Sequence, residues 1–92
     1  MISAQALGNT GDAYVELKNY DQATTYFKKA ADKASNKFLS PFYLKKLGLV
    51  YEAQNDNKSA ADTYKKIKTD YPESTEAQSI EAYIARTEAK VQ

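Results

Sequence analysis

An internal repeat with an offset of 37 residues is the feature that most constrains how this chain can fold. Residues of the same kind recur at this single offset, in the same order along the chain. The matched pairs are Leu7 and Leu44, Gly11 and Gly48, Tyr14 and Tyr51, Ala23 and Ala60, Phe27 and Tyr64, and the runs 28–30 and 65–67. One unit of this length cannot bury its apolar face alone, so two copies predict a stack of similar units with a shared core.

The apolar residues of each unit follow helical spacing. In the first unit they form two stripes, which a turn-forming run at 18–20 separates. The stripes are Leu7, Tyr14 and Leu17, and then Ala23, Tyr26, Phe27, Ala30 and Ala31. The pattern continues with Leu44, Leu47 and Tyr51, with Ala60, Ala61, Tyr64 and Ile67, and with Ala77, Ile80, Ile84 and Val91. This spacing, with few glycines and prolines, predicts about five helices.

Start and stop signals separate these helices. Asp21 and Asn57 are expected to cap the second helix of each unit, because their side chains can accept hydrogen bonds from the free amides of the first turn. Other signals are Ser40-Pro41 at the start of the third helix, Pro72 after the fourth, and Ser74 or Thr75 before the fifth.

Small residues at matched positions indicate close packing within each helix pair. A side chain at Gly11 or Gly48 would hold the two helices apart, and Ala23 and Ala60 are expected to face these glycines. The predicted repeat core is Leu7, Gly11, Tyr14, Ala23, Phe27, Ala30, Leu44, Leu47, Gly48, Tyr51, Ala60, Tyr64, Ile67 and Pro72. The fold class that follows is all-α, with antiparallel helix pairs stacked on one another.

Composition argues against several classes of function. The 92 residues suffice for one small domain and include neither cysteine nor histidine, which removes thiolate metal sites and the commonest general base. The net charge of +1 is unlike that of a nucleic-acid binder, and no apolar run is long enough to span a bilayer. No catalytic constellation is present in the sequence. We therefore expect no enzyme activity, no cofactor or metal, and no nucleic-acid partner.

The pattern resembles the tetratricopeptide repeat, whose usual unit has about 34 residues. The second unit carries most of the family motif, as Leu44, Leu47, Gly48, Tyr51, Ala60, Tyr64 and Pro72, with Ile67 in place of an alanine. The first unit has Thr10 where leucine is usual and Ser35 where proline is usual. We place its three extra residues between Lys33 and Leu39. The resemblance covers residues 4–72 and implies a short solenoid of two repeats, followed by a capping helix.

The expected organisation is one structural domain in three parts, namely repeat 1 at 1–37, repeat 2 at 38–73 and the capping helix at 74–92. The last helix has a polar outer face that includes Glu81, Arg86 and Glu88, whereas Ile2 and Leu7 leave the front of repeat 1 uncapped. We therefore expect a piece of a longer array, or weak self-association through this front. The run 71–74 is also similar to junctions in bacterial cell-envelope repeat proteins of the outer-membrane assembly and Tol-Pal type. That similarity slightly favours the periplasm, or a membrane anchor facing it, and leaves the cytoplasm open.

In the tetratricopeptide family, the first helices of successive repeats line a groove that holds a segment of a partner protein. Projected onto this chain, the resemblance implies a groove formed by Gln5, Asn9, Asp12, Glu16, Phe42, Lys45, Lys46, Leu49 and Glu52. Further candidates on this face are Gly8, Val15, Ala53, Glu76, Ser79, Ile80 and Tyr83. Phe42 has two interpretations, because it either faces the groove or packs inward beside Leu39. Gly8 and Asp12 stand where some members clamp a carboxylate with lysine and asparagine, so recognition of a partner's C-terminus is disfavoured.

The leading hypothesis is a scaffold that binds a peptide or protein segment in this groove, without a cofactor. The alternative is a structural spacer or self-association module within a larger protein, for example one of the cell envelope.

Overall fold

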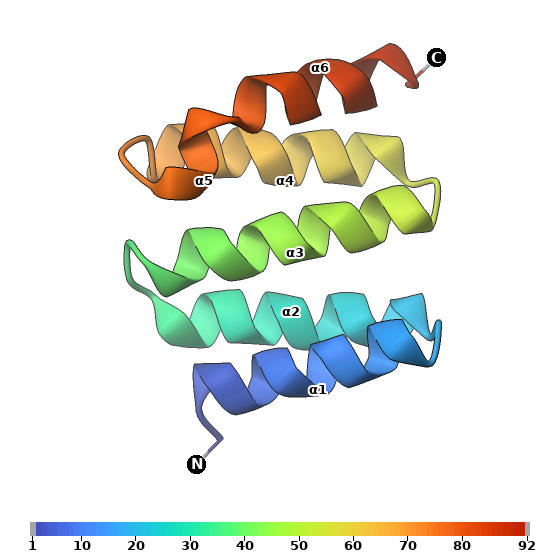
Figure 1. The fold of residues 1–92 in the computed structure, drawn as a ribbon, viewed down its shortest axis with the longest axis vertical. Coiled ribbons are helices and arrows are strands. Elements are labelled where there is room, and N and C mark those ends of the chain that lie inside the picture. The colour runs from blue at the N-terminus through green and yellow to red at the C-terminus, as the bar shows by residue number, and fades with distance from the viewer. Residues whose placement is uncertain (1, 92) are drawn as a thin grey trace.

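The computed structural model describes residues 2–91, and Figure 1 shows helices stacked in chain order. The helices of this part of the chain are α1 (Ala4–Glu16), α2 (Tyr20–Ala34), α3 (Leu39–Ala53), α4 (Asn57–Asp70), α5 (Thr75–Gln78) and α6 (Ile80–Ala89). The long helices α1 to α4 alternate in direction, and α5 and α6 return along α4 (Figure 1). The stack measures 39 × 30 × 14 Å and is therefore a thin slab. The predicted all-α class with stacked helix pairs is confirmed.

The turns inside the two helix pairs have the same geometry. Lys18 and Asn55 adopt left-handed backbone conformations, with φ of 59° and 61°, at the ends of α1 and α3. Asn19 and Asp56 come next, and their side chains accept hydrogen bonds from backbone amides of the first turns of α2 and α4. The caps predicted from the sequence, Asp21 and Asn57, were wrong. The residue that caps is the one that directly follows the left-handed residue, because the chain reverses there.

The start of α3 also differs from the prediction, which placed it at Ser40. The helix begins at Leu39 with Phe38 as its N-cap residue, and the Oδ1 of Asn36, two residues before the cap, accepts from the backbone N–H groups of Phe38 and Leu39 at 2.9 and 2.8 Å. The Ser40 hydroxyl instead donates to the carbonyl oxygen of Ala31 at 2.9 Å. Ser40 therefore ties α3 to α2 and does not cap its own helix.

The three extra residues of the first unit are absorbed by helices. Helix α2 has 15 residues and α4 has 14, so one extra residue lengthens α2. The other two lie at the start of α3, since Pro41 is its third residue while the matched residue Ala4 is the first of α1. The connections after α2 and α4 both have four residues, 35–38 and 71–74. The connection between the repeats is therefore no looser than the one that follows.

An aromatic ring covers each repeat glycine. A Cβ atom at Gly11 would lie 2.7 Å from the Phe27 ring, and one at Gly48 would collide with the Tyr64 ring. The nearest side-chain atoms thus belong to these rings and not to the alanines that we expected opposite the glycines. Phe27 and Tyr64 are fully buried, at 1% and 0% exposure. Each aromatic ring therefore occupies the space that a side chain at the glycine would fill.

The core extends through the whole stack. Its buried hydrophobic residues include Ala23, Phe27, Ala30, Leu44, Leu47, Ala60, Tyr64, Ile67, Ile80 and Ile84. Leu7, Tyr14 and Tyr51 are partly buried against this core. None of the helices in residues 2–91 is long and apolar enough to cross a membrane.

Three residues that the sequence analysis placed in the core or on an apolar stripe are exposed. Leu17 is 74% exposed just beyond the end of α1, on a side of that helix that none of the helices within residues 2–91 covers, and Val91 is 42% exposed beyond the end of α6. Pro72, predicted in the repeat core, is exposed in the turn after α4, where it ends the helix without entering the interior. The expected fifth helix is divided at Ser79, whose φ of −112° and ψ of 7° interrupt it before the buried Ile80.

Candidate functional site

A hollow between α1 and α3 brings together five of the nine residues predicted for the groove. It has a volume of about 440 Å³, and we call it the α1–α3 hollow. It is lined by Gln5, Asn9, Asp12, Phe42, Tyr43 and Lys46. The first three residues come from α1 and the last three from α3. The spacing of three and four residues places them on one side of each helix.

An ion pair crosses the floor of the α1–α3 hollow. Lys46 Nζ lies 2.9 and 3.1 Å from the two carboxylate oxygens of Asp12. The side chain of Lys46 is 32% exposed and that of Asp12 is 48% exposed. The same ammonium lies 5.1 Å from the centre of the Phe42 ring and 5.8 Å from that of Phe27. These contacts neutralise both charges within the chain. Within residues 2–91, the side-chain amides of Gln5 and Asn9 are polar groups of the hollow that have no hydrogen-bond partner.

Phe42 lines the α1–α3 hollow and remains 41% exposed. Its ring meets the ring of the buried Tyr43 edge to face, with centroids 5.1 Å apart. Tyr43 in turn covers Gly8, which is buried. Phe42 therefore faces the α1–α3 hollow and does not pack inward beside Leu39, while its place in a partner-binding groove stays a prediction. Gly8, which we expected in the groove, instead lies beneath an aromatic ring.

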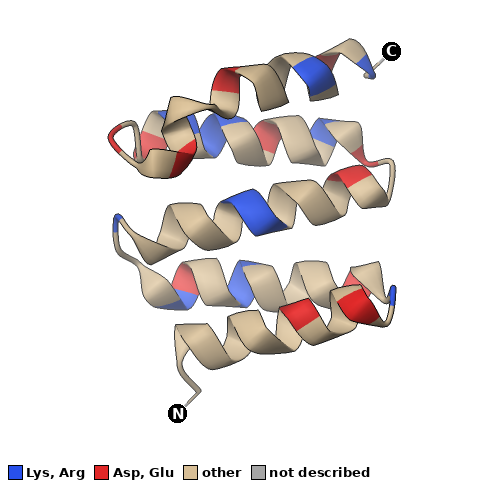
Figure 2. Cartoon of the chain, viewed as in Figure 1, with Lys and Arg blue, Asp and Glu red and all other residues tan. Residues whose placement is uncertain are grey.

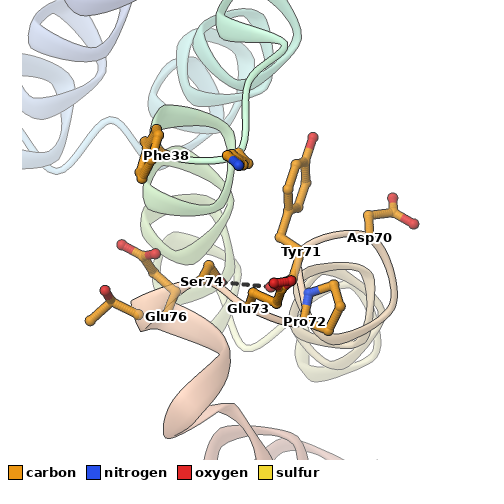
Figure 3. A pocket seen from close by; sticks show the side chains of 9 residues that line it. Phe38, Asp70, Tyr71, Pro72, Glu73, Ser74 and Glu76 are labelled. Atoms are coloured by element: carbon orange, nitrogen blue, oxygen red, sulfur yellow. Dashed lines mark hydrogen bonds between the residues drawn. The ribbon is translucent and has the colours of Figure 1, made fainter.

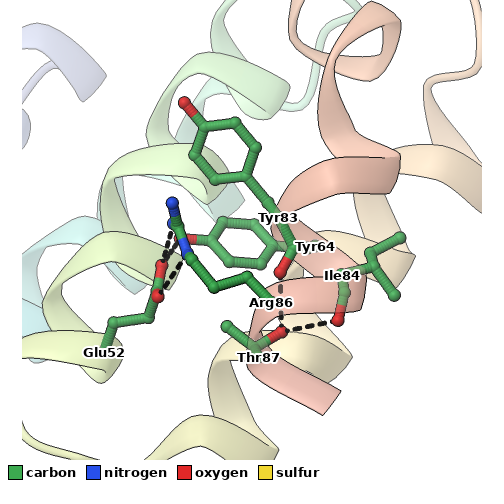
Figure 4. Close-up of polar contacts among 6 residues, drawn as sticks. All are labelled: Glu52, Tyr64, Tyr83, Ile84, Arg86 and Thr87. Carbon is green, nitrogen blue, oxygen red and sulfur yellow. Dashed lines mark hydrogen bonds and ion pairs between the residues drawn. The ribbon is translucent and has the colours of Figure 1, made fainter. Parts of the chain in front are cut away.

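Glu52 holds three helices together (Figure 4). Arg86 of α6 donates from Nε and Nη2 to the two Glu52 oxygens at 3.0 and 2.6 Å, and the Tyr64 hydroxyl of α4 donates at 2.6 Å. Burial alone would raise the pKa of Glu52, but the hydrogen bonds from Arg86 and Tyr64 outweigh it and lower the pKa below its usual value. Burial and the bond to Glu52 raise the pKa of Tyr64. Glu52 was predicted to contact a partner, but its acceptor oxygens are used inside the fold.

The sequence analysis missed the role of Arg86, which it placed on the polar outer face of the last helix. A signal was present, because Arg86 follows Glu52 by 34 residues and Lys46 follows Asp12 by the same number. For Glu52 and Arg86 this spacing is the family period of about 34 residues, at which equivalent positions of neighbouring first helices lie side by side. Asp12 instead matches Leu49 at the offset of 37, and Lys46 lies about one helical turn before Leu49 on the same side of α3. Opposite charges at that spacing predict ion pairs between those helices.

The remaining predicted groove residues do not line the hollow and lie on α1 and α3 or in and between the last two helices, α5 and α6. Lys45 places its ammonium 4.8 Å from the Tyr83 ring centre, and Leu49 is 44% exposed. Glu16, Ala53 and Ser79 are exposed, and Val15 and Glu76 are partly buried. Ile80, which we expected on the groove face, is fully buried and belongs to the core.

Charges of both signs are distributed over the helices (Figure 2). Helix α6 is tied to α4 by Lys65 with Glu88 at 2.5 Å and by Lys68 with Glu81 at 2.9 Å. The polar face predicted for the last helix is thus partly turned toward α4. Within residues 2–91, no group of three or more His, Cys, Asp or Glu side chains could hold a metal ion.

Comparison with known protein families agrees with the repeat pattern. Two models described as tetratricopeptide repeat match the chain, one at residues 4–34 and the other at 46–74. No curated protein and no solved structure matches it significantly. Tetratricopeptide repeats generally serve as non-catalytic modules for protein–protein interaction, so partners of this chain are expected among proteins. From the repeat motif, the stacked helix pairs and the two family matches, we conclude that this chain belongs to the tetratricopeptide-repeat family.

Proposed function

We propose that this chain binds an extended segment of another protein across the α1–α3 hollow. The observation that carries the proposal is the convergence of five predicted groove residues on one hollow, two of which have free side-chain amides. Neither Gln5 nor Asn9 has a side-chain hydrogen bond to any residue among 2–91. Each amide can donate to a carbonyl oxygen and accept from an N–H group. Together they match the hydrogen-bonding pattern of an extended peptide backbone.

The apolar part of the hollow supplies a contact for one side chain of the bound segment. Phe42 is accessible, and Leu49 is exposed two turns further along α3. Because Asp12 and Lys46 neutralise each other, the hollow does not select a strongly charged segment. An uncharged, partly apolar segment is the partner that this surface fits.

Selection from a displayed library of random peptides, followed by calorimetry, tests this proposal. We expect selected peptides to bind with micromolar Kd, about −8 kcal/mol, which suits a short groove. Asn9→Ala with Phe42→Ala should weaken binding at least tenfold, or about 1.4 kcal/mol. Lys66→Ala, on the exposed side of α4, is the matched control and should leave Kd unchanged. Selection of peptides that bind the double variant as tightly as the wild type would refute the α1–α3 hollow as the site.

The exposed front of α1 favours self-association as a second candidate function. Ile2 is 62% and Leu17 is 74% exposed, and the small residues Ala6 and Ala13 between them are exposed too. At an offset of 37, these alanines match Tyr43 and Val50, which are buried in the core. The side of α3 that carries Tyr43 and Val50 is thus covered by other helices, while the equivalent side of α1, with Ala6 and Ala13, faces solvent.

Sedimentation at several protein concentrations tests this second candidate. We expect the sedimentation coefficient to rise with concentration, because association buries the apolar front. Leu17→Glu should abolish this rise of the sedimentation coefficient. Lys18→Glu, which introduces the same side chain at the next position, is the control and should leave the rise in place. A wild type that stays monomeric at every concentration would exclude self-association and leave groove binding untouched.

A further inference from the structure

We propose that a second cavity, at the junction between the repeats and the last helices, binds an arginine side chain of a partner protein. This junction cavity has a volume of about 400 Å³ and lies between the turn 35–38 and the turn 71–74. The residues that the argument uses are Lys37, Phe38, Asp70, Tyr71, Glu73 and Glu76. It shares no residue with the α1–α3 hollow, so the inference does not depend on the function proposed above.

Two aromatic side chains flank the junction cavity. Figure 3 shows Phe38 on one side and Tyr71 on the other, with Glu76 below Phe38 and Glu73 below Tyr71, beside Pro72. Phe38 is 75% exposed, the highest value among the large hydrophobic residues described as exposed. The ammonium of Lys37 lies 5.9 Å from the centre of the Phe38 ring, so this ring already lies next to a cation of the chain. The faces of aromatic rings attract cations in this way.

Within the described part of the chain, the carboxylates of the junction cavity have no cationic partner. Asp70, Glu73 and Glu76 form no ion pair within residues 2–91, whereas Glu52, Glu81 and Glu88 are each paired with a lysine or arginine. Lys37 is the one basic residue that lines the cavity, so its lining carries more negative than positive charge. The chain as a whole has a net charge of +1. The excess of negative charge is therefore local and would repel an anionic ligand.

Arginine is the side chain that satisfies both features. Its guanidinium is planar, stacks on aromatic faces, and can donate to more than one carboxylate at the same time. A neutral apolar side chain would contact Phe38 and Tyr71 but would leave Glu73 and Glu76 without a partner. A lysine ammonium is a compact, strongly hydrated charge and stacks less well on a ring. The cavity volume is near the lower end of the range of about 300–1,000 Å³ for small-molecule sites, which suits a single long side chain.

The probe for this site is the capped tripeptide Ac-Gly-Arg-Gly-NH₂, titrated into the ¹⁵N-labelled full chain and followed by amide chemical shifts. We expect millimolar binding, with shifts concentrated at Phe38 and at residues 71–76. The peptide with citrulline in place of arginine has nearly the same shape without the charge and should bind at least about fivefold more weakly. Ac-Gly-Lys-Gly-NH₂ should bind about threefold more weakly than the arginine peptide, because it loses the stacking contact.

Variants separate this site from general attraction to negative charge. Glu73→Gln with Glu76→Gln should reduce affinity for the arginine peptide about fivefold, and Phe38→Ala about threefold. The matched control is Asp32→Asn, which removes an exposed carboxylate on α2 that forms no ion pair with any of residues 2–91 and should leave the affinity unchanged. These positions are exposed or at the surface, so the variants are expected to fold, and retained far-UV circular dichroism would verify this.

Several results would overturn the proposal. They are equal binding of the citrulline peptide, equal binding of the lysine peptide, shifts spread over other acidic residues, unchanged affinity in the Glu73/Glu76 variant, and no shifts at all. Shifts at Gln5 and Asn9 in place of the junction cavity would also contradict it. Since those two residues belong to the α1–α3 hollow, the two proposals can fail separately.

Discussion

At the residue scale, the repeat glycines show how one missing side chain fixes the position of a large one. Gly48 carries no Cβ, and the ring of Tyr64 lies against its backbone with no exposed surface. The hydroxyl of the same ring is held by Glu52 at 2.6 Å. The ring is therefore fixed at both ends and cannot move aside without breaking a partly buried hydrogen bond. The same relation between Gly11 and Phe27 lacks this polar anchor.

We predict that Gly48→Ala destabilises the fold even though alanine favours helices. The better helix propensity contributes about 1 kcal/mol. Overpacking against an immobile ring costs about 1–3 kcal/mol, so the net change should be a loss of up to about 2 kcal/mol. Gly48→Leu should lower the free energy of unfolding by more than Gly48→Ala does, because its side chain is larger. Urea denaturation followed by circular dichroism measures both, with Lys66→Ala as a control expected to stay within about 0.5 kcal/mol. Equal stability of all three variants would show that the glycine contact is not tight.

We predict that Glu52→Gln removes part of the pH dependence of stability. The pKa of Glu52 is lowered in the folded state, so its contribution is complete above the unfolded value of 4.5 and is lost as the pH falls through the lower folded value. At neutral pH the variant should be less stable by about 1–3 kcal/mol, since Arg86 and Tyr64 lose a charged acceptor. The difference from the wild type should shrink in acid. The measurement extends to about pH 3, roughly one unit below the usual carboxyl pKa. A stability difference between wild type and variant that stays constant over this range would contradict the role assigned to Glu52.

At the scale of elements, the turns rather than the apolar stripes fix where helices begin. The stripes located the four long helices correctly, because burial repeats at the helical period. They could not locate the caps, because Asn19 caps α2 only as a result of the left-handed Lys18 before it. No side-chain pattern marks lysine as a left-handed residue. In the same way, nothing in the sequence indicated that Asn36, and not Ser40, supplies the side-chain acceptor at the start of α3.

We predict that Asn36→Ala destabilises the chain by about 1 kcal/mol, because two backbone N–H groups at the start of α3 lose their acceptor. Asn36→Asp keeps a side-chain oxygen at the same position and should restore most of the loss. Thermal unfolding of the two variants beside the wild type provides the measurement. If Asn36→Asp were as unstable as Asn36→Ala, the acceptor oxygen would not be the stabilising group.

At the scale of the whole molecule, stability is shared between neighbouring helices. Each long helix packs mainly on the one before and the one after it, so the inner helices are covered on two sides. Helix α1 has only α2 as a major neighbour, and its front carries the exposed Leu17. At the other end, α6 covers α4 with the buried Ile80, Ile84 and Thr87. The stack is therefore better closed at its C-terminal end than at its front.

We predict that amide hydrogen exchange is fastest in α1 among the four long helices and slowest in α3 and α4. Local opening of α1 breaks extensive packing on α2 and a few contacts with α3, such as the Asp12–Lys46 ion pair, whereas opening of α3 or α4 breaks extensive packing on two sides. Exchange followed by nuclear magnetic resonance at several protein concentrations measures this directly. Protection of α1 that equals that of α3 in a dilute, monomeric sample would show that the whole stack opens as a single unit.

The sequence by itself determined the all-α class and much of the buried core, because burial recurs at the helical period and at the repeat offset. It did not identify the buried Tyr43 and Val50, and it wrongly included the exposed Pro72. It also selected the helices that line the α1–α3 hollow, through the family resemblance. Only the tertiary structure decided which polar residues there are free. In the sequence, Glu52 and Asp12 both read as exposed acidic residues, yet in the structure each forms an ion pair with a basic residue 34 positions further along the chain. The junction cavity likewise depends on two turns far apart in the chain, and no local pattern encodes the distance between them.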